Sequence, residues 1–62
     1  MNARPQDIPV AVREAIVRKF APDIELAEQV MACLNWDSIN GNYYFTYANM
    51  YHGIETDGYI HT

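Results

Sequence analysis

The amino-acid sequence predicts an α+β fold, in which a two-helix N-terminal hairpin is followed by a Tyr-rich β-hairpin. Apolar residues recur at helical spacing through the first half of the chain. Turn-forming residues then fill positions 37–42. The composition changes at this point, because seven of the eight aromatic residues lie from Trp36 onward. A length of 62 residues predicts one small domain over residues 1–62.

The first predicted helix spans residues 9–20 and follows a flexible polar arm at residues 1–7. Pro9 suits the first turn of a helix, where a missing N–H costs nothing. The apolar stripe of this helix recurs every fourth residue, at Val12, Ile16 and Phe20. Such a stripe indicates a helix with one buried face.

The second predicted helix spans residues 22–36. The residue before a proline avoids the α region, so Pro22 separates the two helices and opens the second one. Asp23 and Glu25 in the first turn complement the helix dipole. The apolar stripe of the second helix is Ile24, Ala27, Val30 or Met31, and Leu34. The short joint predicts an angled or antiparallel helix pair.

The segment 43–61 is predicted to form the β-hairpin. Positions 43–47 read Tyr-Tyr-Phe-Thr-Tyr, a composition with high strand propensity. Glycines at positions 53 and 58 predict turns, and residues 59–61 a second short strand. If the alternation runs on through this segment, one side carries Tyr43, Phe45, Tyr47 and Tyr51.

An all-α fold is the alternative for the same segment. Asn42 is an acceptable N-cap and Gly53 an acceptable residue after a helix C-terminus. A helix between them would complete a three-helix domain. Aromatic and β-branched residues lose rotamer freedom in helices, which favours the strand interpretation.

Acidic and basic residues are separated along the chain. All four basic residues fall within the first nineteen positions, where Asp7 and Glu14 leave a net charge of +2. From Phe20 onward there are six acidic residues and no Lys or Arg. Nucleic-acid binding needs a cationic surface, so we expect no direct nucleic-acid contact. The alternative is a weak nucleic-acid binder that uses Arg13, Arg18 and Lys19.

The sequence predicts no enzyme, no metal site and no cofactor. Four potential metal ligands lie within ten residues, but their spacing matches no known metal motif. These residues are His52, Glu55, Asp57 and His61. The single cysteine, Cys33, stands among apolar residues and is expected to be a buried hydrophobe. An unpaired cysteine and the absence of a leader or membrane-spanning run predict a cytoplasmic protein without membrane contact.

The aromatic surplus is the feature that points to a function. Five tyrosines and one tryptophan exceed what a small core uses, and tyrosine is enriched at binding surfaces. We therefore expect a small acidic protein-interaction module, an inhibitor or adaptor that docks on a basic, nucleic-acid-binding protein. A structural or oligomerising accessory subunit is the alternative, since so short a chain gains stability from a homo-oligomer. The predicted partner-binding residues are Tyr43, Tyr44, Tyr47, Tyr51, Glu55, Asp57 and Tyr59.

Overall fold

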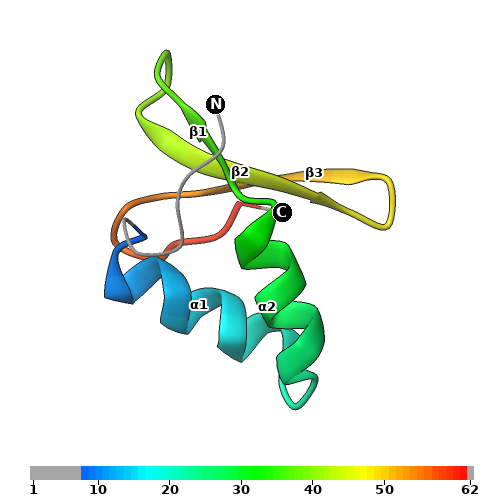
Figure 1. The fold of residues 1–62 in the computed structure, drawn as a ribbon. Coiled ribbons are helices and arrows are strands. Elements are labelled where there is room, and N and C mark those ends of the chain that lie inside the picture. Colours follow the sequence, from blue (N-terminus) through cyan, green and yellow to red (C-terminus); the bar gives the residue numbers. More distant parts are fainter. Residues whose placement is uncertain (1–7, 62) are drawn as a thin grey trace.

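The computed structural model describes residues 8–61, in which two helices precede a three-stranded antiparallel sheet (Figure 1). This arrangement confirms the α+β prediction, and the all-α alternative is not supported. The predicted arm at residues 1–7 lies outside the described residues. The strands follow one another in the order β1-β2-β3. The elements are helices α1 (Val10–Phe20) and α2 (Ile24–Ala32) and strands β1 (Asn35–Asp37), β2 (Asn42–Tyr47) and β3 (Met50–Ile54).

Helix α1 agrees with the predicted span 9–20 to within one residue. Pro9 precedes the first helical residue, and its carbonyl oxygen accepts a hydrogen bond from the backbone N–H of Arg13 at 3.0 Å. The helix stops at Phe20 because Ala21, the residue before Pro22, adopts an extended conformation with φ −55° and ψ 142°.

Helix α2 is shorter than the predicted span 22–36. It begins after Asp23, whose side chain accepts a hydrogen bond from the backbone N–H of Leu26 at 3.0 Å and so caps the helix. It ends before Trp36, because residues 35–37 pair with β2 as strand β1. In this strand the Trp36 ring meets the Tyr43 ring edge to face, with centroids 4.8 Å apart.

Cys33 is exposed, which corrects the prediction that it is buried. It lies at the C-terminal end of α2, where the helix gives way to β1. The next residue, Leu34, takes the fully buried position instead. Ile24 likewise leaves the predicted stripe, because it is half exposed at the start of α2.

The β2–β3 connection differs from the predicted turns. It is a two-residue turn at Ala48 and Asn49, whose φ angles of 52° and 64° both lie in the left-handed region. This combination gives the turn type that matches the twist of paired strands. Gly53 lies within β3 rather than at a turn. Gly58 does occupy a turn, with φ 96°, and Ile60 then forms an isolated bridge to Ile54.

Both helices lie on one side of the sheet, and the core fills the space between them (Figure 1). The rings of Phe20 and Phe45 join the end of α1 to the central strand, with centroids 6.1 Å apart. The buried apolar residues come from α1 and its flank (Ile8, Val12, Ala15, Ile16, Phe20), from α2 and its flank (Ala27, Val30, Leu34) and from the sheet (Tyr43, Phe45, Ile54). Within residues 8–61, the other face of the sheet is covered by neither helix.

Candidate functional site

The register of the sheet sorts its side chains onto two faces. Residues opposite one another on paired strands project to the same side. The covered face points to the helices and comprises Trp36, Tyr43, Phe45, Tyr47, Met50, His52 and Ile54. The open face points away and comprises Asn35, Asp37, Asn42, Tyr44, Thr46, Tyr51 and Gly53. Within residues 8–61, neither helix lies over the open face (Figure 1).

Tyr43 belongs to the core, which corrects its assignment to the partner-binding residues. Its exposed fraction is 8%, because strand alternation places it against Trp36 on the covered face. Tyr47 lies on the same face near the hairpin turn and is partly exposed. Its ring meets Phe20 edge to face, with centroids 5.0 Å apart.

Tyr44 and Tyr51 form a stacked pair on the open face. Their ring centroids are 5.3 Å apart and their planes differ by 23°. Tyr51 was predicted to share a side with Tyr43, and this is wrong because the Ala48–Asn49 turn reverses the chain between them. Gly53 stands opposite Tyr44 and has no side chain there, so the Tyr44 ring leans to its diagonal neighbour Tyr51.

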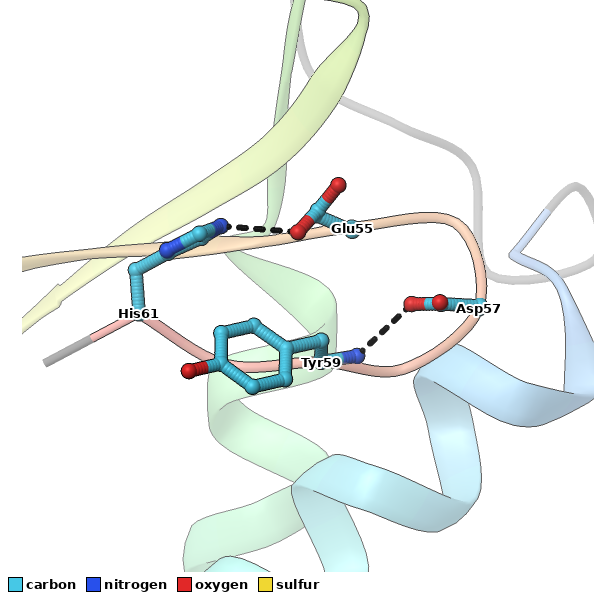
Figure 2. A network of polar contacts seen from close by, with 4 residues as sticks. All are labelled: Glu55, Asp57, Tyr59 and His61. Carbon is cyan, nitrogen blue, oxygen red and sulfur yellow. Dashed lines mark hydrogen bonds and ion pairs between the residues drawn. The ribbon is translucent and has the colours of Figure 1, made fainter.

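Asp57 and Glu55 have different roles in the segment after β3 (Figure 2). The Asp57 carboxylate accepts a hydrogen bond from the backbone N–H of Tyr59 at 3.0 Å, so it holds the turn at Gly58. The Glu55 carboxylate lies 3.0 Å from Nε2 of His61. Both partners in this second contact are about half exposed. Glu55 is therefore available to a ligand, whereas Asp57 serves the local backbone.

A pocket with a volume of about 350 Å³ lies where the open face meets this segment. We name it the Gly53 pocket, because Gly53 forms part of its lining between two larger neighbours, Tyr51 and Glu55. It is lined by the Asn40–Gly41 turn, Asn42, Tyr51, Gly53, Glu55, Thr56 and His61. The pocket thus combines an aromatic ring, a carboxylate, an imidazole and amide groups.

Asp37 adds a second carboxylate to the open face, at the end of β1. A hydrogen bond from the Asn40 side chain lowers the pKa of this carboxyl, and backbone N–H groups of Asn40 and Ile39 lower it further. Partial burial of the carboxyl raises its pKa by less than the two Asn40 hydrogen bonds lower it. Asp37 therefore keeps its negative charge while it organises the turn that borders the Gly53 pocket.

The four potential metal ligands do not converge. Among residues 8–61 no group of three or more His, Cys, Asp or Glu side chains is placed to hold a metal ion. His52 points to the helices, where its ring stacks on Phe45 with centroids 5.2 Å apart. Its buried Nδ1 atom has no hydrogen-bond partner. His52 is thus a core residue and lies on the face opposite Glu55 and His61.

Tyr59 is not among the residues that line the Gly53 pocket, although it contacts His61, which does line it. Its ring meets His61 edge to face at 4.9 Å, and its exposed fraction is 61%. On its other side it lines a shallow hollow with Arg18 and Lys19 of α1. The basic residues of the described chain thus lie on α1, and none lies on the open face. Neither helix in residues 8–61 has the length and apolar character needed to cross a bilayer.

No protein-family model, curated protein or solved structure matches this chain. Its function must therefore be inferred from the chemistry of its surface. The open face offers a stacked tyrosine pair and the Asp37 carboxylate, and the Glu55 carboxylate lies beside it. Such a surface can hold a flat or cationic group by ring contact and by charge.

Sequence reasoning missed Asn42 and Gly53 as residues of the candidate site. It assigned both to helix or hairpin boundaries, whereas both lie in strands and line the pocket. A glycine inside a strand often marks a close approach of another group. That signal could have identified Gly53, had the turn at positions 48 and 49 been recognised.

Proposed function

We propose that this chain is a small, non-catalytic interaction module that docks the open face of its sheet on a partner protein with a basic surface. The observation that carries the proposal is the stacked pair of Tyr44 and Tyr51, which stands on an acidic face that neither described helix covers. Tyrosine offers a large contact area with few rotatable bonds, so ordering it at an interface costs little entropy.

Charge supports a basic partner. Asp37 and Glu55 lie on or beside the open face, and every Lys and Arg among residues 8–61 belongs to α1. Like charges on a partner would be repelled from this face, and a cationic surface would be attracted to it. A partner that normally binds nucleic acid would present such a surface, so the module acts as an inhibitor or adaptor of that protein.

The experiment compares two exposed apolar residues on different surfaces. Tyr51 is 56% exposed on the open face, and Ile24 is 51% exposed at the start of α2. Immobilised wild-type chain, Tyr51→Ser and Ile24→Ser are each incubated with lysate of the source organism, and captured proteins are quantified by mass spectrometry. We expect one stoichiometric basic protein with the wild type and with Ile24→Ser, and its loss with Tyr51→Ser.

Salt separates the charge contribution from the ring contact. Screening shortens the reach of exposed charges, so capture by charge weakens between low and high salt, whereas capture by an apolar ring contact does not. Equal capture by all three chains, or no stoichiometric partner for the wild type, contradicts the proposal. Urea unfolding of the purified variants controls for loss of folding.

A self-assembling accessory subunit is the second candidate, because Met50 and Tyr47 are exposed near the hairpin turn. The turn projects beyond the helices (Figure 1). Analytical ultracentrifugation over a wide concentration range tests this candidate. An oligomer that Met50→Ser converts to monomer supports it, and a concentration-independent monomer rejects it.

A further inference from the structure

The Gly53 pocket exists because one strand position has no side chain. Gly53 lies between Tyr51 and Glu55, and all three residues line the pocket. A Cβ atom added to Gly53 would lie 2.9 Å from Nδ2 of Asn42 and 3.7 Å from Cδ2 of His61. The side chains of Asn42 and His61 therefore converge on the position that a larger residue would fill.

The walls of the pocket are fixed by contacts of its own residues. The backbone N–H of His61 donates to the carbonyl oxygen of Gly53 at 2.8 Å, which anchors the C-terminal segment beside β3. The Tyr51 ring is supported from behind by its stack on Tyr44. The ring and the imidazole are thus held in place before a ligand arrives, which lowers the entropy cost of binding.

The charge of the pocket favours a cation. Among the described residues that line it, Glu55 is the one carboxylate, and none is a Lys or an Arg. Within residues 8–61 the Glu55 carboxylate has a single partner, His61, through one of its two oxygens. The other oxygen points away from the imidazole in Figure 2. The second oxygen of this carboxylate is left for a cationic ligand.

We infer that the Gly53 pocket receives the guanidinium group of an arginine side chain from the partner protein, an inference that rests on the proposed function. A guanidinium is planar, stacks on aromatic rings and donates up to five hydrogen bonds. Tyr51 supplies a ring face, Glu55 a carboxylate, and Thr56 a hydroxyl acceptor. A lysine ammonium is a compact, strongly hydrated charge that makes less use of a ring and of several acceptors.

The test is a titration of the ¹⁵N-labelled full chain with N-acetyl-arginine methylamide at constant pH, followed by amide chemical shifts. We expect saturable shifts confined to the pocket, at Gly41, Gly53, Thr56 and His61, with a dissociation constant in the millimolar range. The citrulline analogue has a planar side-chain group of similar shape but no charge. The lysine analogue has the positive charge but no planar group. Both should produce much smaller shifts. Shifts that spread over all acidic residues, or equal shifts with the lysine analogue, overturn the inference.

Two variants change the pocket by different means. Gly53→Ala adds a methyl group to the lining of the pocket and should abolish the saturable shifts. Its backbone φ lies outside the left-handed region, and the nearest atom is the end of the Asn42 side chain, so the variant should fold. Glu55→Gln keeps the shape and removes the charge, which should weaken binding roughly threefold. The matched control is Glu28→Gln on the exposed surface of α2, which should bind as the wild type does. Undiminished binding by both pocket variants overturns the inference.

The inference and the proposed function fail in distinguishable ways. If a basic partner is captured through Tyr51 but Gly53→Ala captures it equally well, the docking face stands and the arginine pocket is wrong. If the arginine analogue binds as expected and no partner is captured, the pocket stands and the proposed function is wrong.

Discussion

Tyrosines lie on both faces of the sheet, but they have different roles on each face. Tyr43 and Tyr44 are neighbours in β2, yet Tyr43 is buried against Trp36 and Tyr44 stacks on the exposed ring of Tyr51. On the covered face the rings contribute to stability by apolar burial. On the open face they form a surface whose rings remain in contact with water. The direction in which a strand points each side chain, rather than residue type, therefore decides which tyrosines are available to a partner.

The largest expected difference between the faces is in stability. Phe45 is 2% exposed and contacts Phe20 and His52, so Phe45→Ala should lower the free energy of unfolding by about 3–5 kcal/mol. Tyr44→Ala on the open face should cost less than about 1 kcal/mol. Urea unfolding followed by Trp36 fluorescence measures both. Similar losses of unfolding free energy for the two variants would contradict the proposed difference between the two faces.

The covered face contains one polar residue whose removal should increase stability. His52 is buried and its Nδ1 atom has no partner, so the folded state bears the cost of removing that atom from water. His52→Leu should raise the free energy of unfolding by about 1 kcal/mol. The same urea assay checks it. A loss of stability instead would mean that the stack on Phe45 outweighs the unpaired nitrogen.

A smaller gain is expected at the turn that sets which face Tyr51 occupies. Ala48 has φ 52°, which is unfavourable for a residue with a Cβ atom. Ala48→Gly relieves this strain but gives the unfolded chain more freedom, so the net gain should be about 0.5 kcal/mol. Thermal unfolding measures it, and binding through the open face should be unchanged. If the arginine analogue produced a different pattern of amide chemical shifts in this variant, the turn would also determine the shape of the Gly53 pocket.

The smallest expected effect is a pH dependence on the open face. Hydrogen bonds from Asn40 and Ile39 hold the pKa of the Asp37 carboxyl below its unfolded value of 3.8. The stability that this charge contributes is present above pH 3.8 and is lost as the pH falls through the lower folded pKa. Asp37→Asn should therefore melt slightly below the wild type at pH 6, and the difference between the two melting temperatures should decrease in acid. A difference in melting temperature that is independent of pH would contradict a stabilising role for the Asp37 charge.

Local sequence patterns predicted which helices and strands form better than they predicted where each one begins and ends. The stripe of Val12, Ile16 and Phe20 identified α1 because every fourth position of a helix lies on one face. The end of α2 could not be predicted in the same way, since Trp36 leaves the helix to pair with Tyr43, seven residues further along the chain. Such pairing is a tertiary contact that no local pattern contains.

The site was less predictable than the fold for a similar reason. Six of the seven proposed partner-binding residues are at least partly exposed, but Tyr43 is not. The sequence analysis assigned side chains to the two faces by strict alternation along a single strand. The turn at Ala48 and Asn49, which contains no glycine, was not recognised, and it places Tyr51 on the face opposite to the predicted one. The contact between Glu55 and His61 depends on the C-terminal segment returning beside β3, which the spacing alone does not indicate.

The position of β2 also bears on solubility. Its Tyr-Tyr-Phe-Thr-Tyr run combines high strand propensity with no charge and no proline, a composition prone to fibril formation. In the folded chain this run is the middle strand, and β1 and β3 pair with its two sides. The outer edge of β3 is itself partly occupied by His61 and the Ile54–Ile60 bridge. The segment most able to recruit other copies of the chain is thereby kept away from the edges of the sheet, where strand-to-strand aggregation begins.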